Sequence, residues 1–129
     1  MKAPEPHNFL YKYQAQIIGV TDGDTITALV DLGFGVWKRT KLRLFGINAP
    51  ELRRGTSEDR AAGNASMEYL RKLILKKTVT VDTIKDKTGK YGRMLAVIYY
   101  EKEHEDGKVE RFCVNELMVK MGRAVPAEY

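Results

Sequence analysis

The sequence predicts one α+β domain, residues 1–129, in which β-structure dominates. Two observations lead to this prediction. Short apolar runs with strand-like alternation recur in both halves of the chain, and only one long segment, residues 56–77, has apolar residues at helical spacing. The length suits a single compact domain, and no linker or internal repeat divides the chain. Residues 1–10 are expected to form a loose lead-in.

A β-hairpin is predicted at the start of the domain. Residues 11–20 have the composition of a strand. Residues 21–24, Thr-Asp-Gly-Asp, contain the Asp-Gly pair that is a frequent hairpin turn. Residues 25–30 return as a second strand whose alternate residues are apolar. The turn therefore holds two carboxylates at the end of a strand.

A third strand is predicted over residues 36–47, after a glycine-containing turn at 31–35. Leu42 and Leu44 alternate with basic residues, so this strand is expected to be half buried. The strand ends before Pro50, because proline lacks the donor that a strand ladder needs.

An amphipathic helix is predicted over residues 56–77. Thr56 and Asp59 have the capping-box spacing that begins a helix. Gly63 weakens the first turns, because glycine is a poor helix former. The residues expected on the buried face follow at helical spacing. They are Ala62, Ser66, Tyr69, Leu70, Leu73 and Ile74.

The C-terminal half is predicted to hold further strands and a short helix. The strands are expected over residues 78–84, 94–100 and 109–112. An acidic segment with Asp106-Gly107 turns the chain between the last two, and a helix from Val114 ends at Gly122. This order fits a small Greek-key barrel of the OB type. A sheet with helices on one face is the alternative.

The charge pattern favours a polyanionic partner. The chain has 22 basic and 17 acidic residues, a formal charge of +5 and a sequence pI near 9.3. The acidic residues between Tyr100 and Lys108 are interpreted as a solvated face, and separation of the signs would attract phosphate to one side. The basic clusters are Lys38, Arg39, Lys41 and Arg43; Arg53 and Arg54; and Lys85, Lys87, Lys90 and Arg93.

Composition also argues against several classes of protein. Cys113 is the only cysteine, so no intrachain disulfide forms. The only histidines, His7 and His104, neighbour no cysteine, which argues against a zinc site. No apolar stretch approaches the ~20 residues of a membrane span, and no signal peptide is visible. A cytoplasmic location is therefore expected for the chain as written, and secretion if an export signal was trimmed.

Four segments place ionisable groups near the ends of the predicted strands. Asp24 would offer a carboxylate oxygen to a hard cation, and Asn48 an amide oxygen to the same cation. Arg43 would grip a phosphate through two donors. Glu51 would activate or orient a water for attack on phosphorus. Taken singly, these residues are better explained as turn or solvated strand residues.

The other two segments lie further along the chain. Arg93 would stabilise the charged oxygens of a phosphoryl-transfer transition state, with Lys90 and Tyr91 adding phosphate contacts. The last segment, residues 122–124 with Tyr129 beyond it, is explained as a helix stop and a frayed tail. Only the joint order of the segments favours a catalytic interpretation.

That joint order resembles a known family. Asp-Gly-Asp-Thr at 22–25, Arg-x-x-Gly-Ile-Asn-Ala-Pro-Glu at 43–51 and Lys-Tyr-Gly-Arg at 90–93 resemble the signature of the staphylococcal nuclease family. Residues 114–117 and 122–124 are similar to that family's closing helix. The resemblance runs from about Ile17 to about Ala124. It implies a five-stranded OB-like Greek-key barrel with two packed helices.

The resemblance also implies an activity. It implies a calcium-dependent endonuclease, a phosphodiesterase that hydrolyses DNA and RNA and leaves 3′-phosphate ends. The expected partners are DNA and RNA, preferably single-stranded, with no membrane, and the expected state is a monomer. By position, Arg43 and Arg93 match the catalytic arginines and Glu51 matches the glutamate usually described as the general base.

The remaining matched positions concern the metal and the substrate. Asp24 matches a metal-ligand aspartate, and Ala49 matches a position that binds calcium through its backbone carbonyl. Asn48 stands where the best-known members have a second aspartate, and losing this charge should weaken calcium binding. The positions expected near the nucleotide are Lys90, Tyr91 and, as the candidate for a stacking tyrosine, Tyr129.

Two alternatives to an enzyme follow from the same residues. The first is a domain of this family that has lost catalysis and only binds nucleic acid, which Asn48 favours. The second is an interaction or structural β-barrel without a nucleic-acid role. This second alternative treats every motif as turn chemistry and explains their joint order as coincidence.

Overall fold

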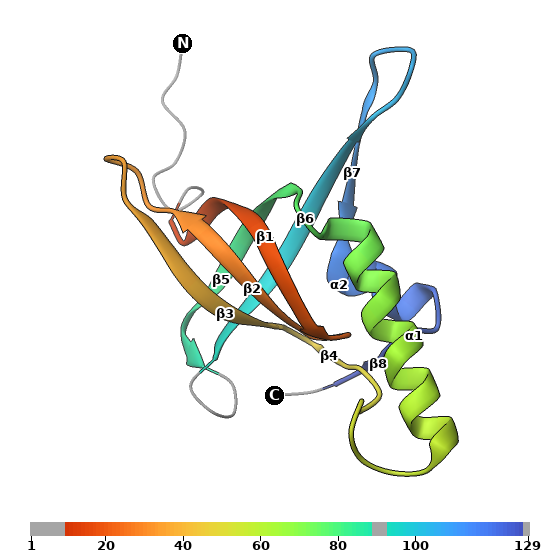
Figure 1. The fold of residues 1–129 in the computed structure, drawn as a ribbon. Helices are drawn as coiled ribbons and strands as arrows, with labels where there is room; N and C mark the ends of the chain where they lie inside the picture. The colour runs from red at the N-terminus through yellow and green to blue at the C-terminus, as the bar shows by residue number, and fades with distance from the viewer. Residues whose placement is uncertain (1–9, 89–92, 128–129) are drawn as a thin grey trace.

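Five strands close into a barrel, and two helices pack against it (Figure 1). The structure, a computed structural model, describes residues 10–88 and 93–127, with the side chains of 85–88 excluded. The barrel strands are β1 (Lys12–Asp22), β2 (Thr25–Asp31), β3 (Trp37–Leu44), β5 (Thr78–Thr88) and β6 (Met94–Glu103). The other elements are β4 (Ile47–Asn48), α1 (Ser57–Ile74), β7 (Val109–Cys113), α2 (Val114–Lys120) and β8 (Val125–Pro126).

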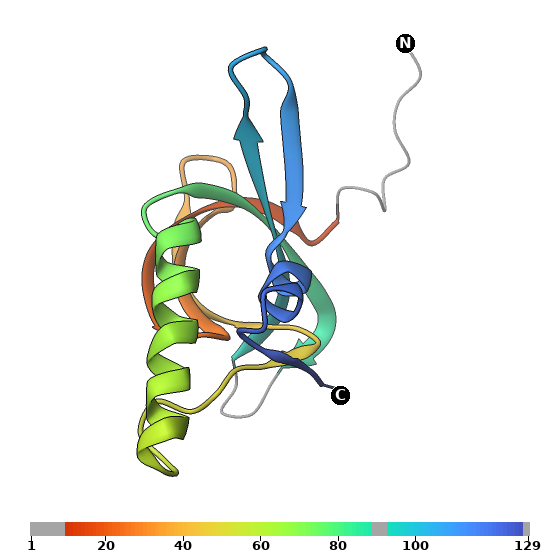
Figure 2. The same ribbon diagram turned by 90° about the vertical axis from the view of Figure 1, so that its right-hand side faces the viewer.

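The strand order closes the barrel. Neighbours in the order β3-β2-β1-β5-β6 pair antiparallel, and β3 then pairs parallel with β6. This last pairing joins Leu42 to Met94 and Leu44 to Ala96. Figure 2 shows the strands as a ring, with α1 along one side. The predicted α+β barrel is confirmed, and the alternative of an open sheet is excluded.

The barrel interior and the two helices share one core. Alternate residues of each strand point inward, as the period of two requires. The core residues with the largest fully buried side chains are Ile17, Ile26, Leu42, Leu44, Leu70, Ile74, Val81, Ile98, Val114 and Met118. Leu70 and Ile74 come from α1, and Val114 and Met118 from α2. Packing of α1 and α2 on the barrel therefore fixes the loops at their ends.

Helix α1 begins as predicted and buries the predicted face, with Ser66, Leu70 and Ile74 inside, except in its first turns. The Thr56 hydroxyl accepts from the Asp59 N–H at 3.2 Å, and the Asp59 carboxylate accepts from the Thr56 N–H at 2.9 Å, which completes the capping box. Ala62 is exposed and Gly63 is buried in its place. The helix ends at Ile74, before the predicted Lys77.

Two predicted strand boundaries were wrong. The strand expected over 36–47 stops at Leu44, because Gly46 has a φ of 81° and turns the chain into β4. The hairpin of β6 and β7 is longer than predicted: its strands run to Glu103 and back from Val109. It projects beyond the ring of strands (Figure 2).

The last segment closes one end of the barrel. Gly122 has a φ of 72° after α2, as expected of a glycine that ends a helix. Residues after it form β8, which pairs with β4 and was not predicted. Of the predicted lead-in, only Leu10 lies within the described residues. No helix in the described ranges is long and apolar enough to cross a membrane.

Candidate functional site

The turn between β1 and β2 places two carboxylates at one end of the barrel. The Asp22 carboxylate accepts a hydrogen bond from the Asp24 N–H at 3.0 Å. The Asp24 carboxylate accepts from the Thr25 hydroxyl at 3.1 Å and from the Ala49 N–H at 2.8 Å. Asp24 is buried, with 7% of its surface exposed. A buried carboxylate needs partners of this kind, and Asp24 is therefore fixed in position.

Arg43 binds two of the predicted metal ligands at once. Its Nη1 lies 2.6 Å from Oδ2 of Asp24, and its Nη2 donates to Oδ1 of Asn48 at 2.5 Å. The side chains of Arg43 and Asp24 are each 11% exposed. Oxygens from the turn after β1 and from β4 thus converge on one positive charge. This contact brings together Asp24 and Asn48, which were predicted to share a cation, and Arg43, which was predicted to bind phosphate.

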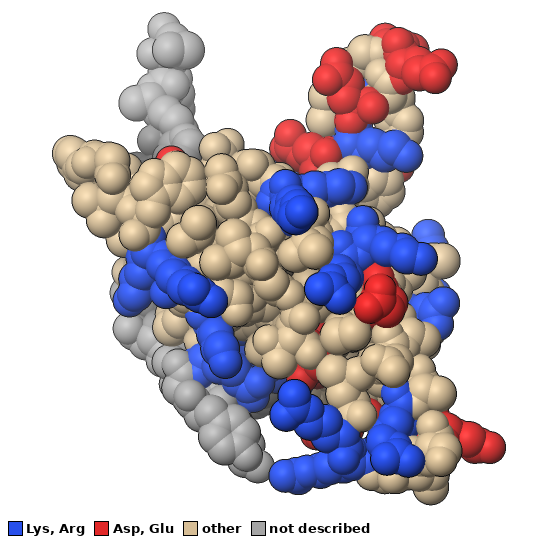
Figure 3. All heavy atoms as spheres, in the orientation of Figure 1, with Lys and Arg blue, Asp and Glu red and all other residues tan. Residues whose placement is uncertain are grey.

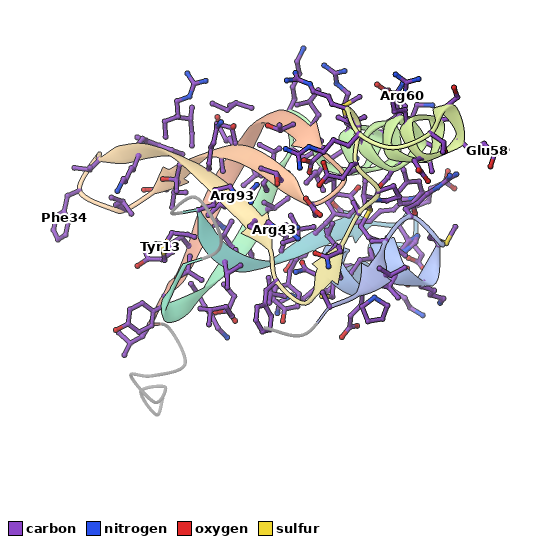
Figure 4. All side chains as sticks on the ribbon, turned by 90° about the horizontal axis from the view of Figure 1, so that it is seen from below. Tyr13, Phe34, Arg43, Glu58, Arg60 and Arg93 are labelled. Atoms are coloured by element: carbon purple, nitrogen blue, oxygen red, sulfur yellow. The ribbon has the colours of Figure 1, made fainter. Side chains whose placement is uncertain are left out.

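Thr25 connects the second arginine to the same cluster. The Arg93 Nη1 donates to the Thr25 hydroxyl oxygen at 3.0 Å, and that hydroxyl donates to Asp24. Figure 4 shows Arg43 and Arg93 at the barrel, far from the labelled Phe34 at the end of the hairpin between β2 and β3. Arg93 at the start of β6 therefore reaches the turn that holds Asp24. The sequence analysis assigned no role to Thr25, although it lies in the Asp-Gly-Asp-Thr motif.

The two carboxyl groups of the turn have opposite pKa shifts. Burial, reinforced by the neighbouring Asp24, raises the pKa of Asp22 to about 6. Burial also acts to raise the pKa of Asp24, but hydrogen bonds from Asp22 and the Ala49 N–H, together with the charge of Arg43, outweigh it and lower that pKa. Asp24 is therefore the carboxylate that stays charged, and Asp22 is the one that holds a proton more readily.

Glu51 lies in the loop between β4 and α1, with an exposed side chain. Among the described residues, that side chain makes no hydrogen bond or ion pair with Asp24 or Arg43. Its backbone is held firmly, because a Cβ added at Gly63 of α1 would lie 2.5 Å from the Glu51 carbonyl oxygen and 3.0 Å from that of Pro50. Only glycine permits this approach, so the loop that carries Glu51 rests directly on the helix.

Helix α1 also supports the carboxylate turn. A Cβ at Gly23 would overlap the side chain of Ser66 and lie 2.7 Å from the Ala49 Cβ. The buried Ser66 hydroxyl donates to the Arg123 carbonyl at 2.7 Å. One face of α1 therefore positions the turn, the Glu51 loop and the chain after α2. The sequence predicted Ser66 on the buried face of the helix but not its contacts, and Gly63 was interpreted only as a weak point of the first turns.

Three predicted substrate-binding residues lie outside the described residues: Lys90, Tyr91 and Tyr129. Ala49 lies within the described residues, and its backbone N–H donates to the Asp24 carboxylate. The predicted role of its carbonyl stays a prediction.

The donor set at this end of the barrel suits a hard cation. Asp22, Asp24 and Asn48 offer carboxylate and amide oxygens, which are the ligands that calcium prefers. The guanidinium of Arg43 lies where the oxygens of Asp24 and Asn48 converge, so positive charge is already favoured there. The described residues contain no group of three or more His, Cys, Asp or Glu side chains arranged to hold a metal ion. Besides the carboxylates of Asp22 and Asp24, a cation would therefore need further oxygen ligands from the Asn48 amide, the backbone, water or substrate.

The candidate site is distinct from the apolar hollow of the structure. An apolar hollow lies between β4, α2 and β8, lined by residues that include Phe45, Ile47, Val119 and Pro126. None of the predicted site residues lines it. Figure 3 shows Lys and Arg side chains over the barrel and acidic side chains gathered at the end of the hairpin of β6 and β7. A surface with this separation of charge suits a long polyanion.

Comparison with known proteins indicates the same family as the sequence motifs. The family model described as "Staphylococcal nuclease homologue" matches residues 41–129, which include Arg43, Glu51 and Arg93. The chain is 27% identical over 117 residues to a micrococcal nuclease of Shigella flexneri, 32% over 113 to an uncharacterized endonuclease of Haemophilus influenzae, and 26% over 96 to a thermonuclease of Staphylococcus hyicus.

These alignments cover most of the chain but only part of each relative. They include 91%, 88% and 74% of this chain and 60%, 52% and 54% of the three relatives, in the same order. The chain thus spans between half and two thirds of their lengths. The family match extends over more than half of the chain, and the structure has the five-stranded barrel and two packed helices that the resemblance implied. The chain therefore belongs to the family of staphylococcal nuclease homologues.

Proposed function

We propose that this protein is a calcium-dependent endonuclease that hydrolyses DNA and RNA, preferably single-stranded, and leaves 3′-phosphate ends. The observation that carries the proposal is the linked cluster of Asp24, Arg43 and Arg93, in which Arg43 pairs with the buried Asp24 carboxylate and Arg93 connects to it through the Thr25 hydroxyl. The printed names of the relatives, a micrococcal nuclease, an endonuclease and a thermonuclease, support the same reaction class.

Arg43 is proposed to exchange its partners when substrate binds. In the structure its two terminal nitrogens bind Asp24 and Asn48. A phosphodiester offers two oxygens with a geometry that the same fork fits. Asp24 and Asn48 would hold a calcium ion, which would supply positive charge at the phosphate, and Arg43, without these two partners, would bind the phosphate oxygens. Arg43 would then orient the phosphorus toward the attacking water.

Glu51 and Arg93 are proposed to act on the water and on the developing charge. Glu51, exposed on its loop, would accept a proton as the water oxygen bonds to phosphorus. The bond from phosphorus to the 5′-oxygen breaks, the leaving oxygen takes a proton, and the phosphate stays on the 3′-oxygen. Arg93 would stabilise the negative charge on the phosphoryl oxygens during this step. The products are a 3′-phosphate and a 5′-hydroxyl.

Glu51→Gln and Arg93→Ala test these roles. Loss of the base should lower kcat about 10²-fold or more, and loss of the arginine should have a similar effect. The assay is cleavage of heat-denatured DNA with calcium, with magnesium and with chelator, and release of inorganic phosphate by a phosphatase specific for 3′ ends. Lys102→Ala, an exposed change on the distant hairpin, is the matched control. Full activity in either variant would remove that residue from the proposed mechanism.

A module that binds nucleic acid without cleaving it is the second candidate. The observation that favours it is Asn48, whose amide gives the cation site one charge fewer than a carboxylate would. Cleavage by the parent protein separates the two candidates directly.

A further inference from the structure

A row of outward-facing side chains on strand β3 extends away from the site. Leu42 and Leu44 are buried, so the alternate residues Arg43, Lys41, Arg39 and Trp37 lie on the opposite face of the strand. The register of β3 with β2 is continuous from Arg43 to Trp37, without a bulge that would change faces. Lys41, Arg39 and Trp37 are exposed. We define these three residues, with Arg43 at one end, as the β3 row.

The spacing of the β3 row suits a nucleic-acid backbone. Alternate residues of a strand lie ~6.7 Å apart, so the row extends about 20 Å from Arg43 to Trp37. The ~6.7 Å spacing of alternate residues is close to the separation of successive phosphates in an extended single strand. Figure 3 shows basic side chains on the flank of the barrel that β3 occupies in Figure 1, leading to an uncharged tip. Consecutive phosphates can therefore meet Arg43, Lys41 and Arg39 in turn.

The row ends at an exposed apolar tip. The loop between β2 and β3 exposes Leu32, Phe34 and Val36, and Trp37 is exposed where β3 begins. Phe34 is fully exposed and has a φ of 56°, between Gly33 and Gly35 at 82° and 75°. Hydrogen bonds of 2.9 Å from the Leu32 N–H to the Val36 carbonyl and from the Val36 N–H to the Gly33 carbonyl define the loop.

This conformation holds an aromatic ring in water. A phenylalanine with positive φ is uncommon, and such positions concentrate at functional sites. Trp37, the first residue of β3, is also half exposed. Flat aromatic faces beside a row of cations are the two features of surfaces that bind single-stranded nucleic acids, because bases stack on the rings while cations contact phosphates.

We propose that the substrate strand follows the β3 row, with Arg39 and Lys41 on successive phosphates and Trp37 and Phe34 stacked on unpaired bases about three nucleotides from the scissile phosphate. This inference rests on the proposed function, because Arg43 is both the end of the row and the phosphate ligand of the site. It makes single strands the preferred substrate, since bases in a duplex do not offer their faces.

A membrane surface is the competing partner for an aromatic and basic tip. The direction of the row favours nucleic acid. A flat surface that touched Phe34 would contact the tip alone, whereas the cations extend about 20 Å back along the barrel to Arg43. A polyanionic strand contacts all of them together.

Trp37 reports on this path directly, because it is the only tryptophan. Its fluorescence would be titrated with single-stranded oligonucleotides in chelator, where the strand stays intact. We expect saturable quenching by an octanucleotide, and tighter binding of the octanucleotide than of a dinucleotide. Phe34→Ala and the double variant Arg39→Ala/Lys41→Ala should each weaken octanucleotide binding about 10-fold. The double variant should also lower the slope of log affinity against log salt by about 1.4.

The controls separate this inference from the proposed function. Lys102→Ala removes an exposed cation from the other hairpin and should bind like the parent. If oligonucleotide quenches Trp37 and the variants bind more weakly, but the parent does not cleave DNA, then the β3 row binds the strand and the proposed function is wrong. Cleavage by a parent whose Phe34 and Arg39/Lys41 variants bind normally would overturn the path alone. A Trp37 response to vesicles of phosphatidylcholine and phosphatidylserine, without one to oligonucleotide, would overturn it in favour of a membrane.

Discussion

Arg43 is the residue that joins the two halves of the candidate site. Its guanidinium binds a carboxylate from the turn after β1 and an amide oxygen from β4. The motifs predicted that Asp24, Asn48 and Arg43 serve one site, because each stands at the end of an apolar strand. They did not predict the contact with Thr25, since a hydroxyl in a turn has many explanations until its partner is known.

The amide side chain of Asn48 leads to a prediction about calcium affinity. Asn48→Asp adds a negative charge where the oxygens of Asp24 and Asn48 converge, and calcium affinity rises with the charge of its ligands. We expect calcium to bind about 10-fold more tightly to the variant. Isothermal titration with calcium measures this, and Asn64→Asp, an exposed change on α1, is the control for added charge. Equal affinity in parent and variant would contradict the assignment of Asn48 as a ligand.

At the scale of elements, α1 is the support on which the site is assembled. Gly63 contacts the backbone of the Glu51 loop, and Ser66 contacts Gly23 in the turn that holds Asp24. The capping box of α1 was predictable because it is a local pattern with a fixed spacing. The contacts of Gly63 were not, because they join residues that are distant in the sequence.

Gly63→Ala tests this support. The added Cβ would meet the backbone oxygens of Glu51 and Pro50, so the loop must shift. A displacement of about 1 Å at a catalytic group can cost about 10²-fold in rate, and we expect kcat to fall by that order. Stability should change less, because alanine improves helix propensity by about 1 kcal/mol.

Asn64→Ala is the matched control for Gly63→Ala, since it alters the next residue on the exposed side of α1. It should keep the parental kcat. Both proteins are compared by cleavage rate and by urea denaturation. A Gly63→Ala protein with parental kcat would show that the position of the Glu51 loop is not needed for the reaction.

The strand boundaries show where sequence periodicity stops being informative. The strand predicted from the alternation of residues 41–44 was extended to residue 47, yet the φ of Gly46 ends β3 at Leu44 and starts β4. The charged residues beyond Tyr100 were expected to be a turn, but β6 continues to Glu103. Charged side chains are compatible with a strand that leaves the barrel and is solvated on both faces, so composition did not locate the turn.

At the scale of the whole molecule, one buried side chain connects the barrel to α2. Asn115 accepts from the Ile98 N–H at 3.0 Å and donates to the carbonyls of Phe45 and Ala96 at 2.8 and 3.0 Å. It is 4% exposed. The segment after β3, strand β6 and helix α2 thus share one amide group. From the sequence, Asn115 was predicted only to lie in a helix.

Asn115→Ala should destabilise the whole fold. The change leaves a buried N–H and buried carbonyls without this partner, and each costs about 1–3 kcal/mol. Because such terms overlap, we expect the free energy of unfolding to fall by about 2–4 kcal/mol, measured by urea denaturation with an unchanged m-value. Glu116→Ala, the exposed neighbour, should stay within about 0.5 kcal/mol of the parent. Equal stability of Asn115→Ala and the parent would contradict the role of this amide.

The charge distribution was predictable in outline. The sequence separates its basic clusters from the acidic segment, and the structure carries the acidic residues to the end of a projecting hairpin (Figure 3). The alternation of leucines with basic residues already indicated an outer face for Lys41 and Arg43, and the continuous register of β3 with β2 extends that face to Arg39 and Trp37.

The central claim is that this end of the barrel hydrolyses phosphodiesters with the help of calcium. The most direct measurement is the initial rate at which the purified protein cleaves heat-denatured DNA, with calcium titrated and with chelator as the reference. We predict a rate that saturates with calcium and disappears in chelator. A folded protein that binds the same DNA but cleaves none of it, at any calcium concentration, would contradict the claim and identify a binding module.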